Sequence, residues 1–126
     1  MQHVLLLALL SMATGCNLIP MGCPAVVYRA IDVDVTDART GAWVARGAVG
    51  SIQDGSYVDS LREVGWLGIP PNDTSTTLGA GLGRPGRYEV SVIRQGYRPW
   101  QRSDVRAREG SCGVETTRVR AELEPL

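Results

Sequence analysis

Residues 87–94 read Arg-Tyr-Glu-Val-Ser-Val-Ile-Arg, and this stretch decides the fold class. Tyr88, Val90 and Val92 point to one side of an extended chain, whereas the residues between them, mostly polar, point to the other side. A hydrophobic period of two is typical of a strand that buries one face and exposes the other. We therefore expect a half-buried strand here, with these three side chains in the core.

The same alternation recurs near both ends of the chain. In residues 25–35 the apolar side chains that share one face are Val27, Ile31, Val33 and Val35. A last strand over residues 114–123 points three apolar side chains inward, those of Val119, Ala121 and Leu123. Further strands are expected over residues 43–53, 56–61, 77–82 and 100–107.

Turn signals separate these segments. Asp54-Gly55 favours a tight hairpin because glycine reaches positive φ readily, and Pro70-Pro71 marks an exposed loop. No window has apolar residues at helical spacing over a helical length. About seven short strands in about 100 residues predict an all-β, seven-stranded antiparallel sandwich with Greek-key connections.

The chain begins with a candidate export signal. Residues 4–10 form an apolar run that is too short to cross a bilayer and is followed by small residues. The stretch Ala13-Thr14-Gly15-Cys16 resembles the processing site of bacterial lipoproteins, in which cleavage precedes the Cys and its sulfur is acylated. A plain signal peptide with cleavage nearby, or a misassigned start, is the alternative.

The lipoprotein interpretation predicts both the domain organisation and the location. We expect a signal peptide over residues 1–15, an acylated Cys16 with a short tether over residues 16–24, and the β-sandwich domain over residues 25–126. The protein would then be lipid-anchored in the bacterial cell envelope, on the periplasmic face of the inner membrane or in the outer membrane. Its membrane contact would be the anchor, since two or more acyl chains hold a protein stably.

Three cysteines are an awkward number for an oxidising compartment. If Cys16 is acylated, Cys23 and Cys112 remain and can form a disulfide, which export permits. The alternative is two buried free thiols. We expect the disulfide because each of the two residues stands at the start of an expected strand.

The composition argues against several classes of function. Arg and Lys together match Asp and Glu at 13 each, so the net charge is zero and the basic face of a nucleic-acid binder is not expected. All 13 basic residues are Arg, and the one His is His3, inside the expected signal peptide. We therefore expect no catalytic residues, no metal site and no cofactor. Asp32 and Asp34 share a strand face and offer a Ca²⁺ pair, or simply a solvated surface.

The aromatic residues are the better lead to a ligand. Trp66 and Trp100 stand in or next to irregular segments, and Arg98 and Arg102 flank Trp100. An exposed ring beside Arg can stack on a sugar or dock a peptide, and favours an acidic glycan or a phosphate. The alternative is that Trp side chains such as Trp43 and Trp100 fill the core, because the chain has no Phe.

Several short motifs recur in the order found in a known family. They are Thr40-Gly41, Asp54-Gly55, Gly86-Arg87-Tyr88-Glu89-Val90 and Gly96-Tyr97. Residues 25–125 resemble the carboxypeptidase regulatory-like domain, a transthyretin-like (prealbumin-like) sandwich. The resemblance implies a seven-stranded fold and a non-catalytic role as an accessory module, stalk or binding platform on exported bacterial proteins.

Taken together, the sequence predicts a non-catalytic cell-envelope lipoprotein that acts by binding or scaffolding. Its partner would be another envelope protein, bound by strand addition at a sheet edge, or a surface polysaccharide. The first alternative is a carbohydrate-binding module that uses exposed Trp residues. The second is a small enzyme that depends on carboxylates or a metal ion.

Overall fold

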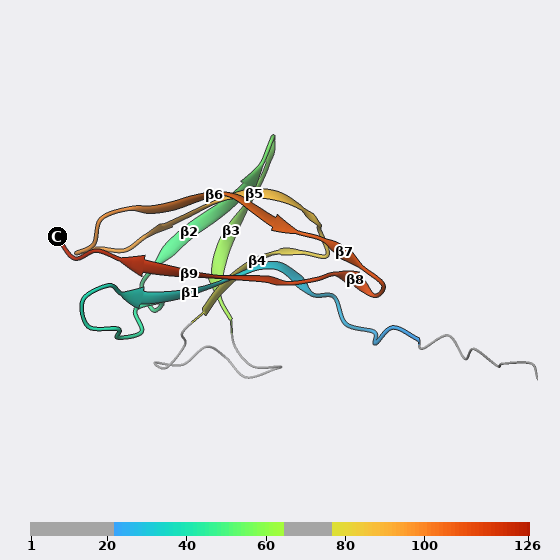
Figure 1. The fold of residues 1–126 in the computed structure, drawn as a ribbon, viewed down its shortest axis with the longest axis horizontal. Coiled ribbons are helices and arrows are strands. Elements are labelled where there is room, and N and C mark those ends of the chain that lie inside the picture. The colour runs from blue at the N-terminus through green and yellow to red at the C-terminus, as the bar shows by residue number, and fades with distance from the viewer. Residues whose placement is uncertain (1–21, 65–76) are drawn as a thin grey trace, which may run out of the picture.

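The computed structural model describes residues 22–64 and 77–126, and every helix or strand found in these ranges is a β-strand (Figure 1). In chain order the strands are β1 (Arg29–Asp37), β2 (Val49–Asp54), β3 (Tyr57–Glu63), β4 (Thr77–Leu82), β5 (Gly86–Ile93), β6 (Trp100–Ala107), β7 (Glu109–Gly110), β8 (Gly113–Val114) and β9 (Thr117–Leu123). Seven of them form one sheet in the order β6-β5-β2-β3-β4-β1-β9, and β7 and β8 form a two-stranded ribbon. The all-β prediction is confirmed. Within these two ranges no helix is long and apolar enough to span a membrane.

The sheet is mostly antiparallel, but β1 and β9 run parallel, so the prediction of a fully antiparallel sheet is wrong for this pair. In their register Val33 lies opposite Val119, and Val35 lies opposite Ala121. All four side chains are buried. The apolar alternation indicates which face of a strand is buried and is the same for both directions of pairing. The sequence pattern therefore contained no signal for strand direction.

Several expected strands begin later than the sequence indicated, and the last one, expected over residues 114–123, is divided into the short β8 and into β9, which starts at Thr117. β1 starts at Arg29 rather than at residue 25, and Val27 is exposed instead of buried. Residues 22–28 lead into the sheet, and the carbonyl of Tyr28 accepts the N–H of Gly83 at 2.8 Å. β2 starts at Val49 rather than at residue 43, because the chain first makes a turn through Gly47, whose φ is +80°.

The core lies on the inner faces of the strands, as the alternation predicts for β5 and β9, whereas β1 is buried or half-buried along its whole length. Its largest fully buried side chains are Tyr88, Ile31, Ile52, Leu78, Leu123, Val33, Val35, Val90 and Val92. Tyr88 can be buried in this apolar core because its hydroxyl has a hydrogen-bond partner: it donates to the carbonyl of Arg84 at 2.6 Å. Burial of such side chains is the main stabilising term for a sheet of this size.

The hairpin expected at Asp54-Gly55 is confirmed, since Asp54 pairs with Tyr57 and β2 and β3 run antiparallel. Close packing elsewhere depends on glycine. A Cβ on Gly50 would lie 2.1 Å from the carbonyl oxygen of Ser91, so no side chain fits there. Gly81 adopts a φ of +78°, which L side chains rarely reach.

The two edge strands of the sheet, β6 and β9, approach one another, so the sheet is nearly closed. At one end the N–H of Arg98 donates to the carbonyl of Glu124 at 2.8 Å, and the N–H of Leu126 donates to that of Gly96 at 3.0 Å. At the other end the hydroxyl of Thr117 donates to the carbonyl of Arg106 at 2.6 Å. We call the line between β6 and β9 the seam, and the end at which the two backbone bonds near Gly96 and Leu126 join the strands its closed end.

Candidate functional site

A groove of about 360 Å³ lies over the seam and is the best candidate for a ligand site. Its walls come from two strands that are adjacent in space but not in sequence. β6 contributes Trp100 and Arg102, and β9 contributes Arg120 and Glu122, with Glu124 just beyond the end of that strand. The three β9-side residues share one face because alternate side chains of an extended chain point the same way. We call this set the seam groove.

Trp100 combines the two roles that the sequence left open. Its side chain is half-buried and packs against the hydrophobic core, at the position where β6 begins opposite Val92 of β5. The guanidinium of Arg102 lies over the ring, with 5.3 Å between its Cζ and the ring centroid. Such a cation–π contact at an exposed site contributes about 0.5–1 kcal/mol, so a ligand can displace the Arg side chain at modest cost.

Arg102 follows Trp100 by two positions, so both side chains lie on the same face of β6, and the strand becomes irregular just after them. The register between β5 and β6 shifts between Tyr88 and Val90, which marks a β-bulge in this pair of strands. Asp104 sits in the bulge with a φ of +59°, in the left-handed region that Asp tolerates better than most residues. Before the bulge the side chains of β6 are largely exposed, and after it Val105 returns to the core.

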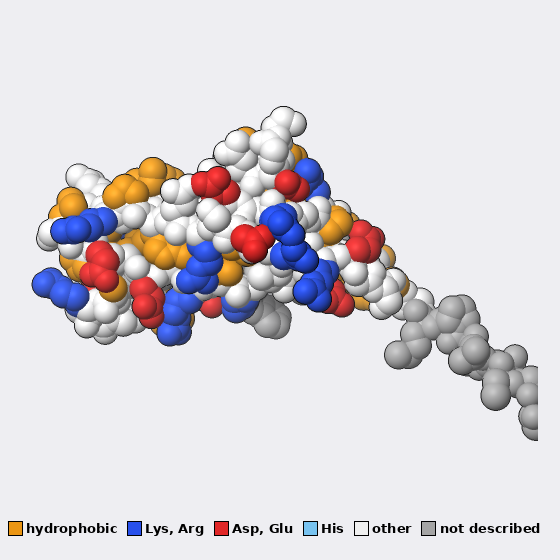
Figure 2. Space-filling model, turned by 45° about the horizontal axis from the view of Figure 1, so that its top comes forward, with side chains coloured by type: hydrophobic (Ala, Val, Ile, Leu, Met, Phe, Trp, Pro, Cys, Tyr) orange, Lys and Arg blue, Asp and Glu red, His pale blue; other side chains and the backbone are white. Residues whose placement is uncertain are grey.

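The charges of the groove are mixed. Two guanidinium groups and two carboxylates line the groove together with one indole ring. Arg is a donor in a planar fork and Glu is an acceptor, so the groove offers both halves of the hydrogen bonding that a polyol needs. Figure 2 shows the same mixing more widely: on the face in view, Arg and acidic side chains are interspersed, with hydrophobic side chains exposed between them.

Of the predicted ligand residues, the structure brings Trp100 and Arg102 together in the groove. The side chain of Arg98 is not among the groove residues, although its backbone closes one end of the seam. Trp66 lies outside the described residues, as does Cys16. The expectation that Trp43 fills the core is wrong: it is 52% exposed and pairs with Thr36 in an isolated bridge.

Sequence reasoning missed Arg120, Glu122 and Glu124 as site residues. They alternate with the inward-pointing Val119, Ala121 and Leu123 and are exposed, a pattern that by itself indicates only a solvated strand face. The signal that they line a groove is the pairing of β9 beside β6 across the seam, and this long-range neighbourhood leaves no local pattern in the sequence.

Asp32 and Asp34 form neither a plain solvated face nor an open cation site. Arg118 of β9 reaches both, with its Nη1 2.6 Å from Asp34 Oδ1 and its Nη2 3.6 Å from Asp32 Oδ2. Arg29 Nε lies 2.8 Å from Asp32 Oδ1. The pairing with Asp34 raises the pKa of Arg118. In the described ranges no group of three or more metal-ligating side chains is found.

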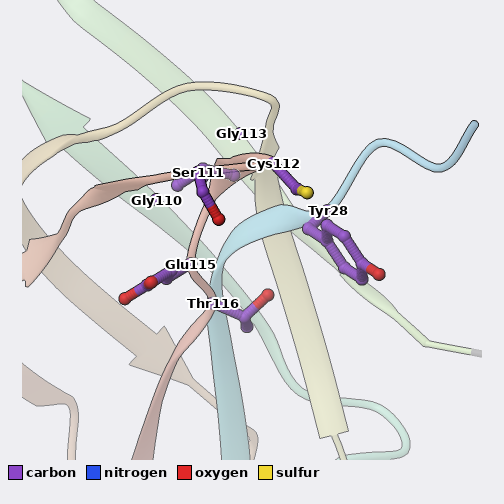
Figure 3. Close-up of a pocket in the computed structure, with 8 residues that line it drawn as sticks. Tyr28, Gly110, Ser111, Cys112, Gly113, Glu115 and Thr116 are labelled. Carbon is purple, nitrogen blue, oxygen red and sulfur yellow. The ribbon is translucent and has the colours of Figure 1, made fainter. Parts of the chain in front are cut away.

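A second hollow, of about 370 Å³, lies at the opposite end of the strands from the closed end of the seam. Tyr28 forms one wall, and the β7–β8 ribbon with the residues after it, Gly110 to Thr116, forms the other (Figure 3). Figure 3 shows the ring of Tyr28 beside Cys112 and the side chain of Glu115 directed away from both. We call this region the tether end.

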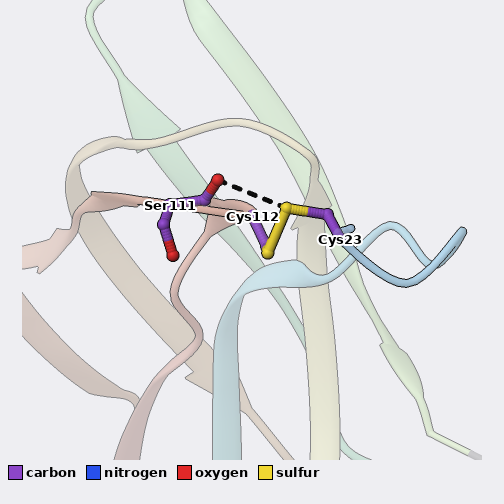
Figure 4. Close-up of a disulfide and its surroundings, with 3 residues drawn as sticks. All are labelled: Cys23, Ser111 and Cys112. Carbon is purple, nitrogen blue, oxygen red and sulfur yellow. Dashed lines mark hydrogen bonds between the residues drawn. A yellow bond between two sulfur atoms is a disulfide. The ribbon is translucent and has the colours of Figure 1, made fainter. Parts of the chain in front are cut away.

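The disulfide between Cys23 and Cys112 is present at the tether end, which excludes the two free thiols (Figure 4). The Cα atoms are 5.1 Å apart and 89 positions apart in sequence. Cys23 Sγ also lies 3.3 Å from the carbonyl oxygen of Ser111, a contact without a proton because the sulfur is bridged. The expectation that each Cys begins a strand is wrong, since Cys23 precedes β1 and Cys112 lies in the turn between β7 and β8.

Comparison with known proteins assigns no family. No protein-family model matches the chain, and no curated protein matches it significantly. The resemblance to the carboxypeptidase regulatory-like domain therefore stays a prediction from the sequence motifs. The seam groove has to be interpreted from its own chemistry.

Proposed function

We propose that this protein is a non-catalytic, lipid-anchored binding protein of the bacterial cell envelope, and that the seam groove binds a carbohydrate. The observation that carries the ligand class is the half-buried Trp100 flanked by two Arg and two carboxylate side chains. A sugar ring has apolar C–H faces and a rim of hydroxyl groups. An indole can stack on the C–H faces, and guanidinium and carboxylate groups can hydrogen-bond to the hydroxyl groups of the rim.

The size of the groove agrees with this ligand class. Small-molecule sites span about 300–1,000 Å³. At about 360 Å³ the groove is at the small end of that range, which suits a short stretch of a glycan. Trp100 is held in place by the core behind it, so its exposed part is preorganised for stacking.

A protein partner bound by strand addition is less well supported. Strand addition needs the free hydrogen-bonding groups of an edge strand. The two edges of this sheet, β6 and β9, face one another and are joined by backbone bonds near Arg98 and Leu126 and by the Thr117 hydroxyl. An incoming strand would have to separate them first.

The location rests on the residues around Cys16. The apolar run before it and the Ala13-Thr14-Gly15-Cys16 site support export and acylation. The disulfide adds a second argument, because it pairs Cys23 with Cys112 and leaves Cys16 as the one remaining cysteine of the chain. Acylation gives that thiol a role in an oxidising compartment.

For the fold we propose a Greek-key sandwich of the transthyretin-like kind. Two groups of strands, β6-β5-β2-β3 and β4-β1-β9, meet where β3 pairs with β4 through only two residue pairs, Arg62–Gly79 and Glu63–Leu78. So short a junction supports two packed layers with a shared core, and a transthyretin-like domain is commonly a binding platform. The chemistry of the sequence supports the same role, since it has no Lys and no His beyond His3.

The test of the ligand class is a titration of the disulfide-bonded domain with a panel of neutral and acidic bacterial cell-wall and capsular oligosaccharides. Isothermal calorimetry and Trp fluorescence are read together. We expect saturable binding to at least one saccharide, abolished in Trp100→Ala and retained in Trp43→Ala, whose exposed indole lies outside the groove. Binding that survives Trp100→Ala, or no binding across the panel, contradicts the proposal.

A further inference from the structure

We propose that the Cys23–Cys112 disulfide fixes the point at which the lipid tether leaves the domain, and so orients the whole molecule on the membrane. The tether end would lie against the lipid headgroups, and the closed end of the seam would point away from them. This inference rests on the proposed acylation of Cys16. It adds an orientation, which acylation alone does not supply.

The first step is a length limit. Cys23 follows Cys16 by seven positions (23 minus 16), and a chain spans at most about 3.6 Å per residue, which gives about 25 Å. The disulfide holds Cys23 against the β7–β8 ribbon. Without it the free chain would extend to Arg29, where β1 begins, and the limit would rise to about 47 Å. The disulfide thus shortens the tether by almost half and attaches it at one end of the domain.

The second step is where the two ends lie. In Figure 1 the blue segment before β1 runs out beside β7 and β8. The C-terminus lies at the opposite end of β1 and β9. β1 has nine residues and therefore spans about 30 Å. β9 runs parallel to it, so both strands lead away from the tether end. The far end is therefore about one strand length more distant from the anchor.

The third step is the surface of the tether end. The exposed apolar side chains there are Val26, Val27, Tyr28 and Leu82. They lie close together, since Leu82 pairs with Arg29 and the carbonyl of Tyr28 accepts the N–H of Gly83. Tyr is favoured at a membrane–water interface because its ring is apolar and its hydroxyl is polar. Because the tether is short and leaves the domain at this end, it would hold these apolar side chains against the lipid surface.

The consequence concerns the seam groove. Trp100 opens β6 directly after the turn at Gly96, and Glu124 follows the end of β9, so both belong to the end remote from the tether. On a membrane the groove would face outward, accessible to a glycan in the surrounding envelope. A tether on the opposite end would press the groove against the lipid.

The experiment uses the full, lipidated protein in phosphatidylethanolamine–phosphatidylglycerol vesicles that contain a headgroup spin-labelled lipid, which quenches nearby Trp fluorescence. Two single-Trp reporters are compared. One retains Trp100 in a Trp43→Phe/Trp66→Phe background, and the other carries Tyr28→Trp with all three native Trp residues changed to Phe. We expect several-fold stronger quenching for the Tyr28→Trp reporter.

The control lengthens the tether without touching the disulfide, by a Gly/Ser insertion of about seven residues between Cys16 and Cys23. The difference in quenching between the reporters should shrink. Equal quenching in the original protein, or stronger quenching of Trp100, overturns the orientation while the anchor stands. Weak quenching of both reporters in protein that floats with the vesicles means that something else, such as a second copy of the chain, covers the patch, and also overturns it. Protein that does not float at all overturns the anchor and this inference with it.

Discussion

The hydroxyl of Tyr97 donates a hydrogen bond to Oδ2 of Asp37 at 2.8 Å and so joins two turns that are 60 positions apart in sequence. The other carboxylate oxygen of Asp37 accepts the N–H groups of Arg39 at 2.8 Å and Thr40 at 3.0 Å. Asp37 therefore organises the turn after β1 and fastens it to the turn before β6. This contact braces the end of the domain at which the seam is closed.

The Tyr97–Asp37 bond predicts a dependence of stability on pH. Hydrogen bonds from Tyr97 and from the Thr40 N–H lower the pKa of Asp37. The contribution of Asp37 to folding stability is therefore present above the ordinary Asp pKa and is lost as the pH falls through the lowered value. The bond to Asp37 and burial raise the pKa of Tyr97. The contribution of Tyr97 to folding stability is therefore present below the ordinary Tyr pKa and is lost as the pH rises through the raised value.

In Tyr97→Phe we expect a lower melting temperature at neutral pH and a shallower loss of stability toward both acid and base. Thermal unfolding followed by circular dichroism across the pH range measures this. The matched control is Tyr28→Phe, which removes the hydroxyl of an exposed tyrosine at the tether end and should leave the profile unchanged. A Tyr97→Phe profile parallel to that of the original protein would mean that the bond does not couple to folding.

Loss of the disulfide should destabilise the domain strongly. Breaking a bridge that closes a loop of 89 residues costs roughly 4–5 kcal/mol on the chain-entropy model. Urea unfolding of Cys112→Ser, and of the original chain with and without reductant, measures this change. Cys16→Ser keeps the bridge and should unfold as the original does. An unchanged midpoint on reduction would show that the bridge does not constrain the unfolded chain.

Gly81→Ala should be considerably more harmful than Gly41→Ala. Both glycines have positive φ, +78° and +73°, which costs about 1–2 kcal/mol for alanine. At Gly81 the new Cβ would also lie 2.9 Å from Ala30 Cβ and from Ile52 Cδ1, whereas at Gly41 it meets nothing within 4 Å. Overpacking adds about 1–3 kcal/mol at the first site only. Equal free energies of unfolding for the two variants would contradict this packing.

Arg102 and Arg98 differ in their expected roles, although both flank Trp100 in sequence. Arg102 lies over the indole in the seam groove, and the side chain of Arg98 does not line it. Once a saccharide that binds has been found, Arg102→Ala should lower the affinity for it by about tenfold, close to 1.4 kcal/mol of binding free energy. Arg98→Ala should change the affinity little. Calorimetry of both variants measures the two affinities. A larger loss for Arg98→Ala would contradict the assignment of the saccharide site to the seam groove.

The sequence predicted strands well where a local signal exists. The alternation around Val90 and Val119 and the hairpin at Asp54-Gly55 agree with the structure. The bridge between Cys23 and Cys112 agrees too, but it was predicted from the count of cysteines and not from a local pattern. Periodicity says which face is buried, and turn residues say where the chain reverses. Neither says which distant strands become neighbours.

For that reason the seam groove was only half predictable. The ring of Trp100 and its neighbour Arg102 form a local pattern, whereas Glu122 joins them through the meeting of β6 and β9. The exposure of Trp43 was missed for a related reason. Its size suggested the core, but the core is filled by Tyr88 and by the aliphatic side chains of the strands.

The measurement that tests the proposed location most directly is the intact mass of the protein purified from its own membrane fraction, with and without reductant. We expect a mass that lacks residues 1–15 and carries acyl chains on Cys16, with a gain of two hydrogens on reduction of Cys23–Cys112. A chain that retains residues 1–15, or a processed chain without lipid, would contradict the anchor and the orientation built on it.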